Sequence, residues 1–222
     1  SQMTVKYDAV KSFAPITMTT TYPTYLVVNV DRVPAKSTTE LLAYVKANPG
    51  KLNYGSAGKG SGQYRNTQIL SKMAGLRMQE ITYTGGTPVM VALTGGEIDL
   101  AFAPLAQIES AADPAKLRVL GVTSAQRSPT SPNVPAIAES EGLSGYDEFD
   151  WHGLLAPAGT PQEVVQRIRE DVTDALKDPK MSSAVSALGL TLKASTPEDF
   201  SSFLAADVLK WKAFFAQEPK GK

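Results

Sequence analysis

Cysteine is absent from the 222 residues of this chain, and histidine occurs only once, at position 152. The lack of thiols excludes disulfide bonds, thiolate metal sites and a cysteine nucleophile. A single histidine also leaves no basis for a zinc site with several histidine ligands, or for a relay of histidines in acid–base catalysis. We therefore expect no bound metal, and any catalysis would have to use carboxylates, hydroxyls or lysines.

The chain also has no excess of charge of either sign and no long apolar run. Lys plus Arg and Asp plus Glu both number 22, and the basic residues are scattered along the sequence. Nucleic-acid binding is therefore disfavoured. No apolar run approaches the roughly 20 residues that span a bilayer, and Ser1–Thr4 resembles no part of a signal peptide. We expect a soluble chain without an export signal of its own.

The most informative segment is the glycine-rich stretch 52–64, which reads as a short strand, a turn and the start of a helix. The first N–H groups of a helix lack partners and carry about half a positive elementary charge, so this arrangement suits a carboxylate or phosphate. Gly58, Gly60 and Gly62 allow the main chain to approach such a ligand closely. The spacing matches neither the P-loop nor the dinucleotide fingerprint, so we expect no ATP or NAD cofactor. A tight turn without a ligand is the alternative.

Strand-like and helix-like segments alternate along the chain. Strands are predicted at 24–30, 52–56, 78–83, 98–103, 117–122, 151–157 and 190–193, and helices at 37–48, 61–74, 88–93, 160–176, 178–189 and from 196 onward. This order predicts an α/β fold with a largely parallel sheet and right-handed crossovers. In such a sheet ligands bind at the carboxyl ends of strands, where the junctions 56–62, 84–88 and 103–106 would converge.

Six phrases, in this order and spacing, resemble the tripartite tricarboxylate transporter receptor family of Bug-type periplasmic solute-binding proteins. They lie at 7–15, 26–29, 52–58, 119–128, 134–139 and 153–161. The resemblance covers nearly the whole chain. It implies a type II periplasmic-binding-protein fold, in which two α/β lobes with mostly parallel sheets close around a hinge on a small organic acid.

The resemblance also implies a domain arrangement. Residues 27–148 would form a complete second lobe, and residues 1–26 and 149–222 would form part of a first lobe that is incomplete. Family members begin with a signal peptide and a further strand and glycine turn, which implies a periplasmic location. A sheet without its first strand–helix units exposes apolar faces. We therefore expect a homodimer, segment exchange or poor stability.

Two departures from the family pattern bear on the choice of ligand. Gly62-Gln63-Tyr64 stands where the family often has small hydroxyl residues followed by histidine, and Ala103 stands where an acidic residue is common. Because that carboxylate would pair with an amino group, its loss makes an amino-acid ligand less favourable. We expect a di- or tricarboxylate or an aromatic acid.

The expected ligand-binding residues follow from the three junctions. Carboxylate binding is assigned to Ser56, Ala57, Gly58, Gly60 and Ser61, and the lining of the site to Tyr83, Thr84, Gly85, Gly86 and Ala103. The predicted function is capture of the acid for a membrane transporter or a sensor, without catalysis, metal or cofactor. Two alternatives stay open. One is an enzyme on the same scaffold using Asp99, His152 or Ser61, and the other is a signalling protein that presents its closed form to a sensor.

Overall fold

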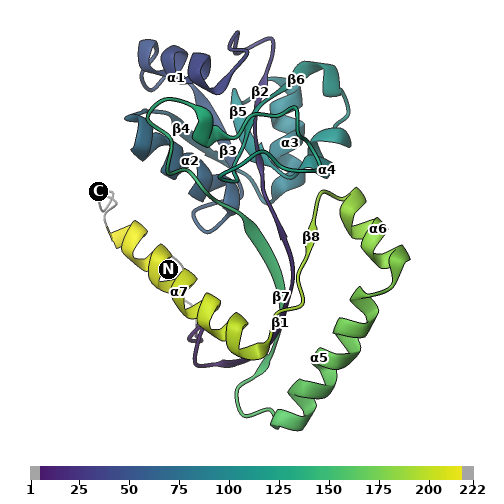
Figure 1. The fold of residues 1–222 in the computed structure, drawn as a ribbon. Helices are drawn as coiled ribbons and strands as arrows, with labels where there is room; N and C mark the ends of the chain where they lie inside the picture. Colours follow the sequence, from purple (N-terminus) through teal and green to yellow (C-terminus); the bar gives the residue numbers. More distant parts are fainter. Residues whose placement is uncertain (1–5, 217–222) are drawn as a thin grey trace. The chain divides into compact units, whose positions relative to one another are not determined.

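The computed structural model describes residues 6–216, and the start Ser1–Thr4 lies outside this range. The chain forms two compact units (Figure 1). Unit 1 takes in the two terminal segments Ser1–Thr21 and Trp151–Lys222, and unit 2 is the continuous segment Tyr22–Asp150.

Unit 2 is built on a five-stranded sheet in the order β4-β3-β5-β2-β6. The strands are β2 (Tyr25–Asn29), β3 (Asn53–Ser56), β4 (Gln79–Thr82), β5 (Leu100–Ala103) and β6 (Leu117–Val122). β3 pairs in parallel with β4 and β5, whereas β2 is antiparallel to both of its neighbours. The predicted α/β class is confirmed, but the parallel direction holds for four strands and not for β2. β2 enters the sheet directly from the preceding strand, without the crossover helix that parallel neighbours need.

The helices of unit 2 are α1 (Thr38–Ala47), α2 (Gly62–Ala74), α3 (Gly86–Gly95) and α4 (Leu105–Glu109), with short 3₁₀ turns at Pro114–Lys116 and Ile137–Glu139. The helices predicted at 37–48 and 61–74 begin and end within one residue of their capping signals, whereas the helix predicted at 88–93 spans Gly86–Gly95 and the helix Leu105–Glu109 was not predicted. The Ser61 side chain caps α2 by accepting a hydrogen bond from the Tyr64 N–H. Gly75 ends α2 in the left-handed conformation, at φ 66°, which glycine adopts without a steric penalty.

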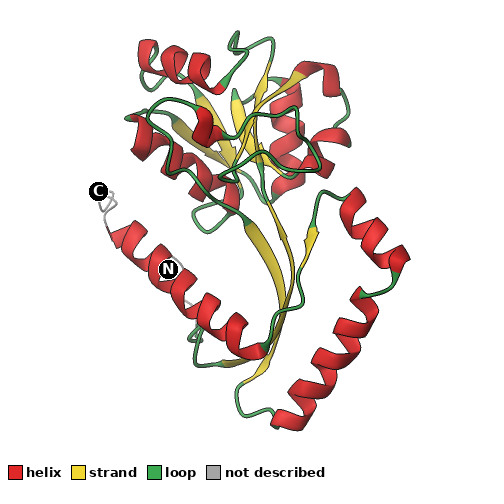
Figure 2. Ribbon diagram, in the orientation of Figure 1, coloured by secondary structure: helices red, strands yellow, loops and turns green. Residues whose placement is uncertain are grey.

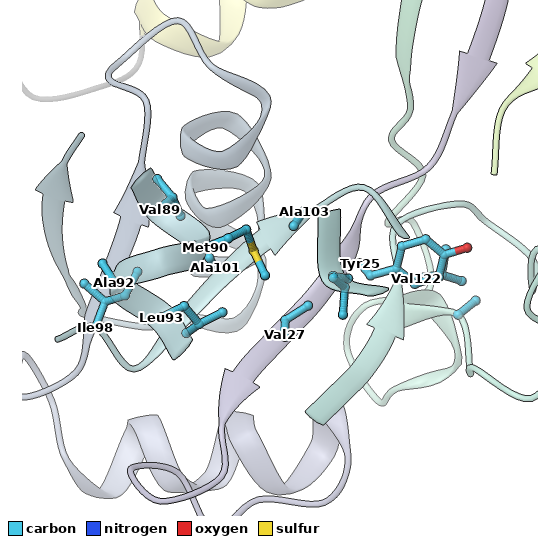
Figure 3. Packing of buried hydrophobic residues seen from close by; sticks show 12 residues of the cluster. Tyr25, Val27, Val89, Met90, Ala92, Leu93, Ile98, Ala101, Ala103 and Val122 are labelled. Atoms are coloured by element: carbon cyan, nitrogen blue, oxygen red, sulfur yellow. The ribbon is translucent and has the colours of Figure 1, made fainter. Parts of the chain in front are cut away.

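The core of unit 2 lies between the sheet and its helices. Figure 2 shows helices on both sides of the sheet, and Figure 3 shows the cluster in which α3 packs on β2 and β5. Tyr25 and Val27 of β2 and Ala101 and Ala103 of β5 belong to this cluster. Every second strand residue faces α3, as the two-residue period of a strand requires. The main chain at the ends of β2 and β5 is therefore held by two strands that are buried throughout.

Tyr146 anchors the last part of unit 2 to α2. Its ring is fully buried, and its hydroxyl donates to the main-chain oxygen of Asn66 at 3.1 Å. Burial raises the pKa of the Tyr146 phenol well above its usual value of 10, and the negative charges of Glu148 and Asp150 raise it further.

Replacing Tyr146 with phenylalanine should lower the free energy of unfolding by about 1 kcal/mol at pH 7, because the buried hydrogen bond from the phenol to the Asn66 main-chain oxygen is lost. In the wild type the folded-state pKa lies above the unfolded-state value of 10. The stabilisation is therefore complete below pH 10 and decreases as the pH rises above it. Urea unfolding at pH 7 and pH 11 should show a smaller alkaline loss for the variant. An equal loss in both proteins would contradict this account.

Unit 1 contains a three-stranded sheet in the order β7-β1-β8. Its strands are β1 (Phe13–Tyr22), β7 (Asp150–Pro157) and β8 (Thr191–Leu192). β8 runs antiparallel to β1. The helices are α5 (Gln162–Leu176), α6 (Pro179–Ala187) and α7 (Pro197–Ala216). The sequence analysis assigned no strand to β1. Among the described residues, no helix is both long and apolar enough to cross a membrane.

Candidate functional site

The three glycine- and proline-containing junctions lie at one edge of the sheet of unit 2. β3 ends at Ser56, β4 at Thr82 and β5 at Ala103, and these three strands are parallel. α2, α3 and α4 begin just after these ends. The Tyr83 N–H donates to the Ser56 main-chain oxygen at 2.8 Å, which ties the first junction to the second.

Side chains from the first and third junctions meet at the second. A Cβ atom added at Gly86, the first residue of α3, would lie 3.0 Å from Gln107 Oε1 and 3.3 Å from Gln63 Nε2. Gln107 Oε1 is buried and has no hydrogen-bond partner among the described residues. The sequence analysis missed Gln107, and named Gln63 only as a departure from the family pattern. No motif marks either residue, because both are defined by packing between helix starts.

Internal hydrogen bonds fix the shape of the first junction. Ser56 is fully buried, and its hydroxyl donates to Glu80 Oε1 at 2.5 Å and accepts from the Gly58 N–H at 2.9 Å. The Ser61 hydroxyl donates to the Gly58 main-chain oxygen at 2.8 Å. Gly58 itself has a φ of 88°, a conformation that favours glycine. Both serine hydroxyls are thus committed to the loop.

Several main-chain N–H groups at this edge have no acceptor. Within residues 6–216, no partner is observed for the N–H groups of Gly62 and Gln63 in the first turn of α2, or for those of Gly86 and Thr87 in the first turn of α3. Unsatisfied donors and the positive end of the helix dipole coincide at both helix starts. This arrangement can bind an anion.

The other predicted residues occupy different surroundings. Thr84 is exposed, whereas Ala103 is fully buried in the core cluster. Tyr83 is half-buried and packs against the same cluster. Burial raises the pKa of its phenol, and the nearby charge of Glu97 raises it further. Gly85 caps the start of α3 in extended backbone.

A charged pair that the sequence analysis missed lies beside α2. Arg65 Nη2 is 2.6 Å from Asp150 Oδ1, and Arg65 Nη1 donates to the Gly60 main-chain oxygen at 3.1 Å. A Cβ atom added at Gly62 would lie 2.5 Å from Asp150 Oδ2. The Asp150 carboxylate therefore lies against the first residue of α2. Arg65 and Asp150 are 85 positions apart in the sequence, so no local pattern could have indicated their contact.

The three residues of the enzyme alternative have separate structural surroundings. Asp99 precedes β5 at the end of the sheet opposite to Ala103, and accepts from Arg32 Nε at 2.9 Å. His152 Nδ1, in unit 1, lies 2.8 Å from Thr20 Oγ1. Ser61 caps α2. Across the described part of the chain, no cluster of three or more His, Cys, Asp or Glu side chains could hold a metal.

Comparison with known proteins shows the family of this chain. Residues 2–218 match the profile described as TctC, the tripartite tricarboxylate transporter family receptor. The chain belongs to this family. A UPF0065 protein from the tcbD-tcbE intergenic region of Pseudomonas sp. (strain P51) is 30% identical over 213 residues, which cover 96% of this chain and 63% of that protein. BugT of Bordetella pertussis is 27% identical over 210 residues, with a coverage of 93% and 63%. The chain thus spans less than two thirds of the length of these curated relatives.

Solved structures show the same fold. R. palustris Rpa4515 with adipate superposes with a TM-score of 0.87 at 27% identity, over 95% of this chain and 70% of that one. The periplasmic binding protein BugD gives a TM-score of 0.85 at 29% identity, over 95% and 71%. The resemblance noted in the sequence, and the type II periplasmic-binding-protein class that it implies, are confirmed. The family consists of solute-binding receptors.

Proposed function

We propose that this protein binds a small organic carboxylate at the edge of the unit 2 sheet, through main-chain N–H groups at the starts of α2 and α3. The observation that carries the proposal is the set of N–H groups without acceptors at two neighbouring helix starts. Each hydrogen bond to a charged group is worth about 1.5–3 kcal/mol, so two or three can orient a small ligand. The serine hydroxyls at 56 and 61 hold the loop in shape rather than contact the ligand.

The chemical class of the ligand follows from what surrounds these groups. The side chain at position 103 is a buried alanine, so β5 offers no carboxylate to an ammonium group. A plain aliphatic or aromatic acid therefore suits the site better than an amino acid. The adipate in the structurally similar R. palustris protein supports an aliphatic dicarboxylate.

Capture of the acid would serve uptake or sensing. The ligand can shift the protein from an open to a closed state. The size of this shift is limited by how much more tightly the closed state binds the ligand than the open state does. A periplasmic location and a membrane transporter or sensor as partner complete the proposal, in keeping with the family.

Two valine substitutions test the site. Position 60 and position 85 have no atom within 4 Å of an added Cβ and no left-handed φ, so Gly60→Val and Gly85→Val should leave the fold intact, which circular dichroism checks. Each should weaken adipate binding at least tenfold, because the side chain keeps the ligand from the N–H groups. Isothermal calorimetry with adipate, benzoate and aspartate measures the effect, and aspartate should bind most weakly.

Gly145→Val is the matched control, because position 145 is equally open and lies in an exposed loop that forms none of the three junctions. It should bind adipate as the wild type does. Equal affinities of the Gly60, Gly85 and Gly145 variants would exclude this edge of the sheet as the binding site.

A further inference from the structure

Arg65 projects from the first turn of the helix whose start forms the proposed site. Its guanidinium contacts two groups at once, the Gly60 main-chain oxygen through Nη1 and Asp150 Oδ1 through Nη2. The two charged side chains are 23% and 20% exposed, so they are shielded from solvent and yet accessible to a small solute. Arginine is the residue best suited to bind a carboxylate, because its planar fork matches the two oxygens.

Asp150 already supplies such a carboxylate from within the chain. It lies against Gly62, where the positive end of α2 favours a negative charge, and it neutralises Arg65. A ligand carboxylate at the start of α2 would therefore meet one positive and one negative side chain close together.

We propose that Arg65 is a carboxylate-binding side chain held in check by Asp150, and that this pair sets the affinity and charge preference of the ligand site. The proposal rests on the proposed function, because it concerns the same ligand at the same helix start. It goes beyond the main-chain cradle by naming a cationic side chain and its internal competitor. It favours ligands with two or more carboxylates, which can compete with Asp150 for the guanidinium.

Charge substitutions distinguish this role from a structural one. Asp150→Asn keeps the size of the side chain and removes the negative charge that competes with the ligand for Arg65, so adipate should bind about tenfold more tightly. Arg65→Gln removes a positive charge next to Asp150 and beside the ligand, so adipate should bind about tenfold more weakly. The double variant Arg65→Gln/Asp150→Asn should return to within about threefold of the wild type. A pair that only stabilises the fold would weaken binding in both single variants.

A second measurement needs no ligand. Tyr22 is half-buried, and the pKa of its phenol is raised by burial first and by the charge of Asp150 second, while Arg65 lowers it. Nuclear magnetic resonance of ¹³C-labelled tyrosine, assigned with Tyr22→Phe, should show a lower Tyr22 pKa in Asp150→Asn and a higher one in Arg65→Gln. These opposite shifts would also show that both variants fold around this cluster.

The outcomes separate the two proposals. If the wild type binds adipate and the affinities do not follow the order Asp150→Asn, wild type, Arg65→Gln, the role of the pair is overturned and the carboxylate site stands. If no variant binds adipate or benzoate while the Tyr22 shifts occur as expected, both proposals are overturned. Tyr22 shifts of the same sign in both variants would overturn the role of the pair on their own.

Discussion

Replacing Arg32 with alanine should lower the free energy of unfolding by about 3 kcal/mol, because it leaves a buried carboxylate without its cation. The Asp99 side chain is 6% exposed, and Arg32 Nε lies 2.9 Å from its Oδ1. The second oxygen, Oδ2, accepts from the Asn53 N–H at 2.7 Å. This cost is at the lower end of the range for breaking a buried ion pair. Arg32 is 48% exposed, so water can partly take its place beside the Asp99 carboxylate.

The main chain of Asp99 explains why the loss should affect the whole of unit 2. Its N–H donates to the Asn53 oxygen, and its oxygen accepts from the Asn29 N–H. Asp99 therefore joins β2, β3 and β5 at the sheet end away from the proposed ligand site. Urea unfolding followed by circular dichroism measures the effect.

The double variant Arg32→Ala/Asp99→Asn is the control for charge. Asparagine removes the uncompensated charge, although its amide matches the Asn53 N–H less well than the carboxylate does, so the double variant should recover at least 1 kcal/mol. If the double variant were no more stable than Arg32→Ala, the cost would lie in lost packing of the arginine stem and not in the stranded charge.

Local chemistry explains what could be predicted from the sequence. The boundaries of α2 follow from Ser61 and Gly75, whose capping roles depend only on near neighbours. The meeting of three junctions at one edge follows from the alternation of strands and helices, and the parallel β3, β4 and β5 confirm it. These features need no knowledge of which distant segments touch.

Features defined by long-range contacts could not be predicted. The pairing of β2 with β5 and β6 depends on where a strand without a crossover helix inserts, and the sequence of a buried strand does not encode its direction. β1 reads as a threonine-rich segment with no clear alternation. In the proposed ligand site, the Arg65–Asp150 pair joins residues far apart in the chain. The sequence therefore indicated the main-chain groups of the proposed site but not the charged pair beside them.

Replacing Phe200 with alanine should lower the free energy of unfolding of unit 1 by about 3–5 kcal/mol, because the ring is fully buried. The ring packs edge-on against Trp151, with centroids 5.3 Å apart, and lies directly over Gly153. Both tryptophans of the chain belong to unit 1, so their fluorescence during urea unfolding follows this unit. Leu209→Ala on the same helix is the control, since Leu209 is 66% exposed and should change stability by less than about 0.5 kcal/mol.

A substitution at Gly153 tests whether Phe200 and the glycine form one packing unit. An added Cβ would lie 2.7 Å from Phe200 Cε1, too close for the ring to stay in place, so Gly153→Ala alone should cost about 1–3 kcal/mol. In the Phe200→Ala background the same methyl group enters the space that the ring has left. The double variant should therefore be more stable than the sum of the single effects predicts, by about 1 kcal/mol or more. Strict additivity would mean that the neighbourhood of Gly153 relaxes independently of the ring, and that α7 is held by other contacts.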